Sequence, residues 1–223
     1  MKAFIIFRDR VTYAQRCFFA LRQADLEVVI VDHGSTWPAA LSLLYYWEAR
    51  GVTVLRRGTG HPRGLWSWQP FRDSACESGE RYIVTDPDVV PSEDCPADWV
   101  QHLSLMLDKY PQKLKAGLGL RTDNLPDHYS RKQQVIDWEA KFWQFPIGDG
   151  AYGAPLDTTL AMYRGGSGFE LDGALRTGFP YVADHLAWHE NLENPTDEQR
   201  WYYDHAERGM SHWAPKGRSA WGD

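Results

Sequence analysis

Short apolar runs alternate with amphipathic stretches along the first half of the chain. Continuous apolar runs are typical of strands buried on both faces, and four occur, at residues 3–7, 27–31, 52–55 and 82–85. Apolar residues recur at helical spacing between them, at residues 12–23, from Pro38 to about Gly51, and at about 70–78 before Gly79. This alternation predicts right-handed crossovers, and hence a mainly parallel sheet flanked by helices.

The second half of the chain has a less regular pattern. It predicts helices at about 98–110, 130–145 and from about 194, and strands at 115–120, 158–163 and 181–183. The sequence of residues 12–15 is similar to a capping box, which would open the first helix. Residues 146–155 contain three Gly and two Pro and are a candidate mobile loop. Because neither a repeat nor a low-complexity linker interrupts the pattern, one domain over residues 1–223 is expected.

Two carboxylates one residue apart follow the fourth apolar run, in Asp86-Pro87-Asp88. On an extended backbone, residues i and i+2 project to the same side, so both can offer oxygen atoms to one divalent cation. Pro87 is expected to end regular strand pairing there. Ligands of open α/β sheets bind beyond the carboxyl ends of the strands, and the sequence therefore predicts a metal site at that edge.

The amino-acid composition argues against some kinds of binding partner and cellular location. The chain has 30 Asp and Glu against 24 Lys and Arg, which argues against a nucleic-acid or anionic membrane surface. Three cysteines without metal-ligand spacing are typical of reduced thiols, and the first apolar run is too short for a signal peptide. No segment is long enough to span a bilayer, so a cytoplasmic protein is expected. Eleven Trp suit either sugar stacking or core packing.

Three segments carry a resemblance to a known family. Val29 to Thr36 is similar to a strand ending in Asp-x-Gly-Ser, Gly60-His61-Pro62-Arg63 to a phosphate-side loop, and Thr85-Asp86-Pro87-Asp88 to an Asp-x-Asp metal motif. Together they resemble nucleotide-sugar glycosyltransferases of the GT-A fold, most closely the small soluble family 2-type members of bacteria and phages. The resemblance covers roughly residues 3–213. It implies a GT-A-like α/β domain with a Rossmann-like sheet, in which residues 1–95 bind the nucleotide and 96–223 the acceptor.

The resemblance also implies roles for particular residues. The enzyme would move a sugar from a nucleotide-sugar donor, UDP-sugar favoured and GDP-sugar possible, to the hydroxyl of a glycan or other acceptor, with Mn²⁺ or Mg²⁺ as cofactor. Asp88 would bind the cation directly, and Asp86 through water or the ribose hydroxyls. Asp32 would accept from base or ribose, and Arg63 and Arg8 would face uridine or phosphate. A turn or helix cap is the alternative for Asp32, and a solvated strand end for Arg8.

The resemblance also implies a third metal ligand, a histidine late in the chain, and His185 is preferred over His189 for this role. A histidine ligand would favour Mn²⁺ over Mg²⁺. The alternative role for His185 is that of a hydrogen-bonded turn histidine. An inverting enzyme needs a carboxylate base. Asp184 stands where many family members have a Glu-Asp pair, but here the pair reads Ala183-Asp184, and Asp157 is the rival. Whether the enzyme inverts or retains configuration stays open.

Two other functions compete. A sugar-nucleotide nucleotidyltransferase typically has a Gly-rich loop after the first strand, whereas residues 7–12 contain no glycine. A carbohydrate-binding protein would be expected to show all-β patterning, against which the predicted helices count. Tryptophans that could wall an acceptor site, or pack in the core, are Trp66, Trp68, Trp138 and Trp143.

Overall fold

The computed structural model of the protein describes residues 1–60, 62–76 and 79–205. Among these residues no helix is long and apolar enough to cross a membrane, and Cys17 and Cys95 are free thiols. The elements in chain order are β1 (Lys2–Phe7), α1 (Val11–Gln23), β2 (Glu27–Asp32), α2 (Pro38–Glu48), β3 (Thr53–Arg56), η1 (Pro62–Ser67), α3 (Gln69–Phe71), η2 (Arg72–Cys76), β4 (Tyr82–Thr85), β5 (Val89–Pro91), α4 (Trp99–Lys109), β6 (Lys115–Leu120), α5 (Lys132–Ala140), η3 (Lys141–Trp143), β7 (Pro146–Gly148), β8 (Ala151–Tyr152), β9 (Ala161–Tyr163), β10 (Ala174–His185), η4 (Leu186–His189) and α6 (Asp197–His205).

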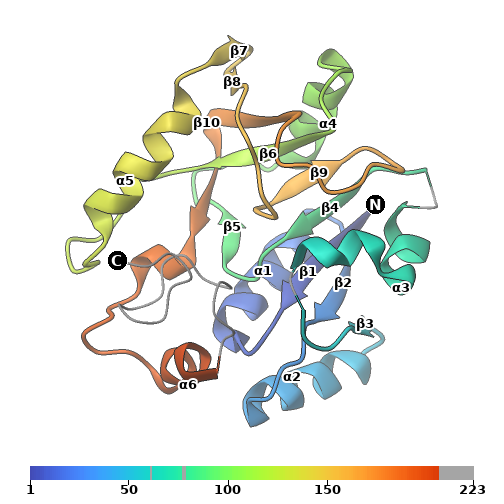
Figure 1. The fold of residues 1–223 in the computed structure, drawn as a ribbon, viewed down its shortest axis with the longest axis vertical. Helices are drawn as coiled ribbons and strands as arrows, with labels where there is room; N and C mark the ends of the chain where they lie inside the picture. The colour runs from blue at the N-terminus through green and yellow to red at the C-terminus, as the bar shows by residue number, and fades with distance from the viewer. Residues whose placement is uncertain (61, 77–78, 206–223) are drawn as a thin grey trace.

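One sheet runs through the described part of the chain, in the order β3-β2-β1-β4-β9-β6-β10-β8-β7, with β5 paired to β10 (Figure 1). β1, β2, β3 and β4 are parallel neighbours. β9 lies antiparallel to both β4 and β6, and β10 is parallel to β6. The predicted fold class, a mainly parallel sheet flanked by helices, is confirmed. The strand predicted at residues 158–163 contains β9, whereas the short strands β5, β7 and β8 were not predicted from the pattern of residues.

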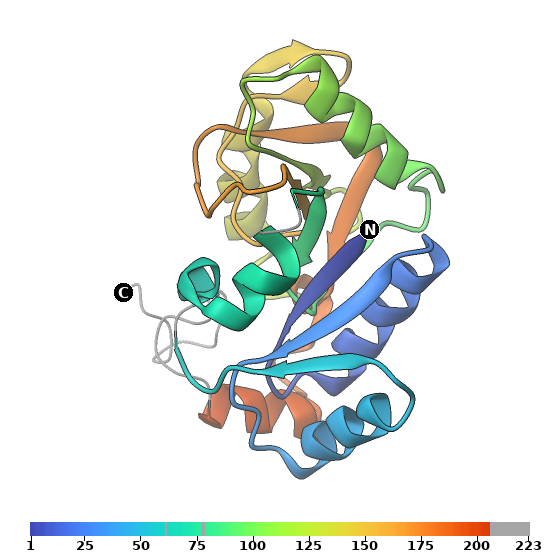
Figure 2. The ribbon, with the colours of Figure 1, turned by 90° about the vertical axis from the view of Figure 1, so that its right-hand side faces the viewer.

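Alternate residues of the central strands bury on opposite faces of the sheet. Ala3, Ile5 and Phe7 of β1 belong to one apolar cluster, whereas Phe4 and Ile6 belong to a second. Figure 2 shows α1 and α2 on one side of the sheet and α3 on the other. Because both faces are covered, the strands have continuous apolar runs instead of an alternating pattern, which is why they could be located from the sequence.

The predicted capping box at residues 12–15 is absent. α1 begins at Val11, and no side chain of its own forms a cap. Glu198 of α6 instead accepts hydrogen bonds from the amide of Thr12, over 3.0 and 3.2 Å, and from its hydroxyl over 2.8 Å. The first helix is therefore capped by a residue far away in sequence, which also docks α6 against α1.

Other predicted elements differ in extent. Residues 146–155, predicted to be a loop, contain β7 and β8, which pair as an antiparallel hairpin. The helix predicted over 130–145 is shorter, because α5 gives way to the 3₁₀ turn η3. The helix predicted over 70–78 consists of α3 and a π-helical turn, and its last two residues lie outside the described residues. The short strand predicted at 181–183 is the end of the long strand β10.

Candidate active site

The Asp-Pro-Asp turn joins β4 to β5 at the carboxyl edge of the parallel strands. β5 pairs antiparallel with the end of β10, and in that register Val89 lies opposite His185. The amide of Leu186 donates to the carbonyl oxygen of Asp88 over 2.7 Å. The break in strand pairing expected at the proline is thus a corner between two strands. This corner places the acidic turn, residues 86–88, beside His185.

Asp86 is in contact with the segment that precedes β9. Thr158, which is 4% exposed, places its hydroxyl oxygen 2.9 Å from each carboxylate oxygen of Asp86. Burial, and then the charges of Asp88 and Asp157, raise the pKa of Asp86 to about 8. Carboxyl groups are therefore crowded at this edge, where a nearby positive charge would reduce their repulsion.

The surroundings of His185 favour the neutral form of its imidazole. Burial lowers its pKa below the ordinary value, and the charge of Asp88 acts in the opposite direction. The imidazole stacks on Trp188, with ring centroids 4.5 Å apart and planes 7° apart. Among the described residues no group forms a hydrogen bond with its buried Nδ1 atom. For His189, burial also lowers the pKa, but the largest opposing charge is that of Asp184. Of the two histidines, His185 is therefore the one whose pKa is affected most, among opposing charges, by a residue of the acidic turn, Asp88.

The described residues contain no ready-formed group of three or more His, Cys, Asp or Glu side chains that could hold a metal ion. Asp86, Asp88 and His185 are neighbours that do not form a closed set of ligands. Their chemistry nevertheless fits Mn²⁺, because the carboxyl groups are crowded and the imidazole is neutral with a buried nitrogen that has no partner.

The residues predicted to bind the nucleotide lie on separate elements. Asp32, at the end of β2, is 5% exposed, and its Oδ1 accepts from the amide of Ser35 over 2.9 Å. The turn predicted as its alternative role is therefore present. Arg8 donates to the carbonyl of His205 over 3.3 Å. Arg63, in η1, is exposed and has its guanidinium carbon 5.4 Å from the ring centre of Phe169.

The two candidate bases have different surroundings. Asp184 follows the strand alternation of β10 and so projects away from the face that His185 occupies. Its Oδ1 accepts from Asn124 Nδ2 over 2.8 Å and lies 4.0 Å from Arg121 Nε. Asp157 is near enough to Asp86 for its charge to raise the pKa of that carboxyl group. Asp157 therefore shares the environment of the acidic turn, and Asp184 lies one residue before His185.

A buried polar cluster behind the turn was not found from the sequence. Arg10 forms an ion pair with Glu190, and the two residues are 3% exposed. Glu190 also accepts from the hydroxyls of Tyr13, over 2.8 Å, and Tyr203. The guanidinium carbon of Arg10 lies 3.9 Å from the ring centre of Tyr202. Arg10 and Tyr13 lie about 180 positions from Glu190 in the chain, and no local pattern marks these contacts.

Asp9 is a second residue that sequence reasoning missed. It is 1% exposed with a positive φ of 55°, and its Oδ1 accepts from the amides of Thr36 and Trp37, each over 2.8 Å. Trp37 is the residue that precedes α2. Asp9 thus caps α2 from the loop after β1 and ties together the loops that follow β1 and β2. A positive φ at a non-glycine residue is uncommon, but the sequence of residues 7–12 does not indicate it.

The tryptophans considered for an acceptor site divide into two groups. Trp66 and Trp68 pack against the apolar cluster on the α3 face, and Trp66 Nε1 donates to the hydroxyl of Tyr82 over 2.9 Å. Trp138 is 50% exposed, and Trp143 stacks on Phe179 with ring centroids 6.2 Å apart. The core role holds for the first two, and the second two remain candidates for acceptor contacts.

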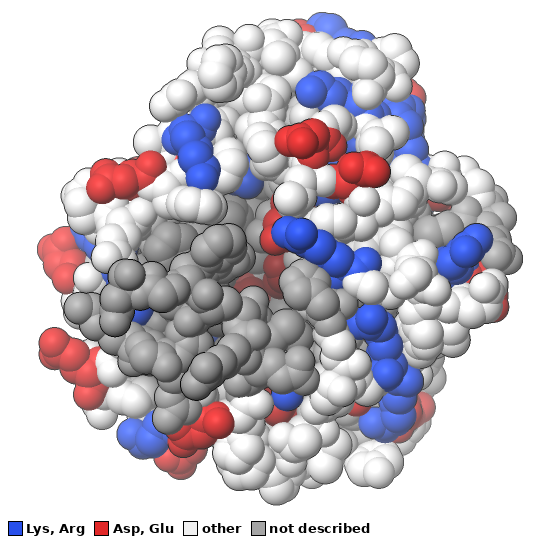
Figure 3. Space-filling model, viewed as in Figure 1, with Lys and Arg blue, Asp and Glu red and all other residues white. Residues whose placement is uncertain are grey.

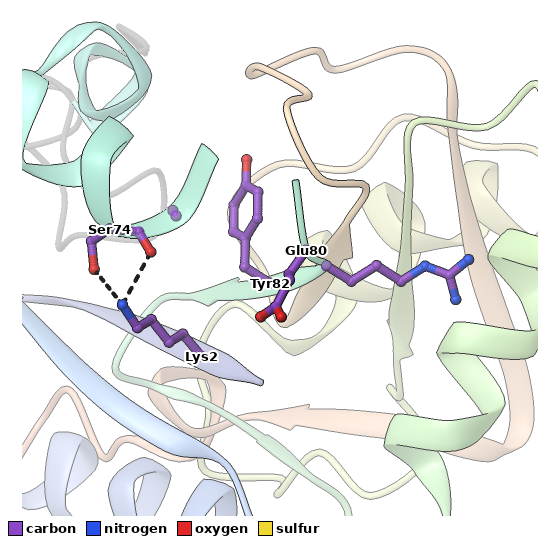
Figure 4. Close-up of a pocket in the computed structure, with 6 residues that line it drawn as sticks. Lys2, Ser74, Glu80 and Tyr82 are labelled. Carbon is purple, nitrogen blue, oxygen red and sulfur yellow. Dashed lines mark hydrogen bonds between the residues drawn. The ribbon is translucent and has the colours of Figure 1, made fainter. Parts of the chain in front are cut away.

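One face of the molecule is hollowed, and a pocket lined by residues of β1, η2 and β4 is a separate feature. Figure 3 shows acidic side chains at the depth of a hollow near the middle of this face, with basic side chains along one rim. A pocket of ≈ 90 Å³ is lined by Lys2, Ser74, Glu80 and Tyr82, with Lys2 Nζ 3.3 Å from Ser74 Oγ (Figure 4). It lies at the opposite ends of β1 and β4 from the acidic turn and is too small for a sugar nucleotide.

Comparison with known proteins identifies the fold. No family model matches the chain, and no curated protein matches its sequence. Among solved structures, the chain is similar to the mannosyltransferase PcManGT from Pyrobaculum calidifontis in complex with GDP-Man and Mn²⁺, with 16% identity and a TM-score of 0.52 over 91% of this chain. It is also similar to S. aureus TarS, with 13% identity and a TM-score of 0.49, over 83% of this chain and 37% of that one.

The chain spans 59% of the mannosyltransferase chain. At this identity the likeness shows the fold, which is the GT-A-type arrangement expected from the sequence. It does not extend to activity, since one fold hosts many functions.

Proposed function

We propose that the protein is a metal-dependent glycosyltransferase that moves a sugar from a nucleotide-sugar donor to an acceptor hydroxyl. The observation that carries the proposal is the acidic turn at the carboxyl edge of a GT-A-type sheet, with neutral His185 beside it. Ligands of open α/β sheets bind at this edge. A cluster of carboxyl groups there suits a diphosphate that is bound through a cation.

The surroundings of the two aspartates support different roles. Both oxygens of Asp86 face the hydroxyl of Thr158, so Asp86 would contact the metal through water or bind the donor ribose. Asp88 and His185 would hold Mn²⁺ or Mg²⁺ directly. When bound, the cation supplies positive charge that offsets the charge developing on the departing diphosphate.

The nucleotide would bind across the loops that follow β1, β2 and β3. Asp32 uses one carboxylate oxygen for its own turn, and the other would accept from base or ribose. Arg8 and Arg63 would face uridine or phosphate. UDP and GDP are both candidates, because the solved mannosyltransferase holds GDP-Man whereas the sequence resemblance favours UDP. The acceptor would be a glycan or another molecule with a hydroxyl group.

Proton transfer from the acceptor would need Asp157 or Asp184 if the enzyme inverts configuration. Asp157 lies in the same charged environment as Asp86. Asp184 is held by Asn124. A retaining enzyme would need neither residue as a base.

Nucleotide binding tests the proposal directly. Thermal shift and calorimetric titration with UDP and GDP, each with and without Mn²⁺, are expected to detect one nucleotide that binds only with the metal. Asp88→Ala should weaken that binding by more than about tenfold, as expected for loss of a direct metal contact. Asp172→Ala is a matched control, because Asp172 is exposed and follows Glu170 at the same spacing away from the turn. Binding that does not depend on metal, or that survives Asp88→Ala, would refute the proposal.

Assays on the same purified protein distinguish glycosyl transfer from the two competing functions. A nucleotidyltransferase would release pyrophosphate from UTP or GTP in the presence of a sugar phosphate, and a glycosyltransferase would not. A carbohydrate-binding protein would bind glycans with no need of a nucleotide. Helices cover both faces of the sheet, which does not match the all-β pattern expected for such a module.

A further inference from the structure

The segment before β9, residues 155–160, lies directly on strand β6. Leu156 and Leu160 are fully buried. At Gly117 of β6, an added Cβ would stand 2.5 Å from Cδ2 of Leu156 and 3.1 Å from the carbonyl oxygen of Leu160. Leu160 has a positive φ of 33°, a conformation that persists only where surrounding contacts enforce it. The 155–160 segment therefore follows a path imposed by the sheet beneath it.

Two buried cations on neighbouring strands hold this path. Lys115 of β6, 1% exposed, donates from Nζ to the carbonyl oxygen of Asp157 over 3.2 Å. Arg176 of β10, 6% exposed, donates from Nε to the carbonyl oxygen of Pro155 over 2.9 Å. Both contacts are to main-chain atoms. They therefore fix the backbone of the segment and not the rotamer of one side chain.

The two cations differ in how their charge is compensated. Arg176 forms a buried ion pair with Glu139 at 2.9 Å. Lys115 has no carboxylate within 4.0 Å among the described residues. Its Nζ instead lies 3.3 Å from the hydroxyl of Tyr163 and 4.8 Å from the ring centre of Phe169. A buried ammonium without a salt bridge depends on its hydrogen bonds, so the Asp157 carbonyl is a principal partner of Lys115.

We infer that Lys115 is a positioning residue for the donor site. It does not touch the donor, but it holds the backbone of Asp157. The next residue, Thr158, thereby reaches both oxygens of Asp86, and the Asp157 carboxylate stays near the acidic turn. The consequence for donor binding rests on the proposed function, in which Asp86 contacts the metal through water or binds the ribose. Loss of Lys115 is expected to release the segment and leave Asp86 without the hydroxyl that orients it.

A double-mutant cycle tests whether Lys115 affects donor binding through Thr158. Affinity for the nucleoside diphosphate that binds the wild type is measured with Mn²⁺ present, for Lys115→Met, Thr158→Val and the double variant. Each single change is expected to weaken binding about tenfold, as for other groups that orient a metal contact. Since both act through the same contact, the double variant should bind within about twofold of Thr158→Val alone. Lys109→Met is the control, because that ammonium is 55% exposed on α4.

Two further measurements separate positioning from a general loss of structure. Amide hydrogen exchange should accelerate in residues 155–160 of Lys115→Met and stay unchanged in α1 and α2. The donor KM should rise while the acceptor KM stays the same. Lys115→Gln retains a hydrogen-bond donor without the charge, and it should restore part of the affinity. It also replaces Lys115→Met in the cycle if the methionine variant does not fold.

The outcomes distinguish the inference from the function on which it depends. A wild type that binds no nucleoside diphosphate would refute the proposed function and this inference with it. A wild type that binds, with Lys115→Met binding equally well, would overturn this inference alone. Additive losses in the double variant, or unchanged exchange in residues 155–160, would also overturn it.

Discussion

Replacing Lys115 by methionine is expected to remove a pH-dependent part of the folding free energy. In the folded chain, burial lowers the pKa of Lys115 from 10.5 to about 8; Asp157 and Glu170 act to raise it and Arg176 to lower it. In the unfolded chain the lysine has its ordinary pKa. Between pH 8 and 10.5 the unfolded state therefore holds a proton that the folded state has released. The contribution of Lys115 to the free energy of unfolding should therefore rise with pH in this window, and the difference between the wild type and Lys115→Met isolates it from the other groups that titrate there.

The size of this effect follows from the pKa difference. One pKa unit corresponds to about 1.36 kcal/mol, and the folded lysine is half protonated near pH 8, so the gain from pH 8 to 9.5 is about 1.5 kcal/mol. Lys115→Met should lack this gain. The range ends at 9.5 because unfolded tyrosines ionise near pH 10. Burial raises the pKa of Tyr163, which would lower the stability of the folded chain at higher pH.

Urea unfolding followed by tryptophan fluorescence measures the difference at several pH values between 7 and 9.5. Lys109→Met, which removes an exposed ammonium, should change with pH as the wild type does. A difference between wild type and Lys115→Met that stays constant within about 0.5 kcal/mol would show that Lys115 keeps its ordinary pKa, and the reasoning would be refuted.

Three further tests, with five variants, address the candidate site and the first helix. His185→Ala is expected to weaken Mn²⁺-dependent nucleotide binding by more than about tenfold and His189→Ala by less than about twofold, so equal losses in calorimetric titration would contradict the choice of His185. Asp157→Asn and Asp184→Asn separate the candidate bases: the base is the residue whose amide lowers kcat by about 100-fold or more in a donor-consumption assay, and two fully active variants would exclude a carboxylate base at either position. Glu198→Ala removes the acceptor at the start of α1 and should lower the free energy of unfolding by about 1–2 kcal/mol in urea; unchanged stability would show that this contact does not cap the helix.

Much of the fold could be predicted because local sequence determines it. β1, β2 and β4 are buried on both faces, so continuous apolar runs located them, and the edge strand β3 was located by the short run at residues 52–55. α2 begins at Pro38, a residue that favours a first helical position. The hairpin of β7 and β8 was missed because glycine and proline in short strands give the same signal as a loop. The strand predicted at residues 158–163 is found over the shorter range Ala161–Tyr163 as β9, but its antiparallel pairing with β4 and β6 is not encoded in the local sequence.

The residues of the candidate site also fall into two groups: those that local sequence could predict and those that depend on distant contacts. Asp86 and Asp88 are adjacent in sequence to the strand that positions them, so the turn could be recognised from its neighbours. The register that places His185 at the turn depends on β5 pairing with β10, almost a hundred residues away. Sequence reasoning could nominate His185 only through resemblance. Thr158 and Lys115 had no signal, because a threonine and a lysine acquire their importance from burial and from contacts made after folding.

The acidic turn is therefore a short local feature that lies between two groups of contacts. We call these groups frames, and each is formed by segments that are distant in the sequence. On one side, Lys115 and Arg176 fix residues 155–160, and Thr158 meets Asp86. On the other side, Glu190 gathers Arg10 and two tyrosine hydroxyls a few residues after His185. Carboxyl groups that repel one another do not hold a shared geometry unless surrounding contacts impose it. Residues in the frames should consequently change metal-dependent binding without touching the ligand.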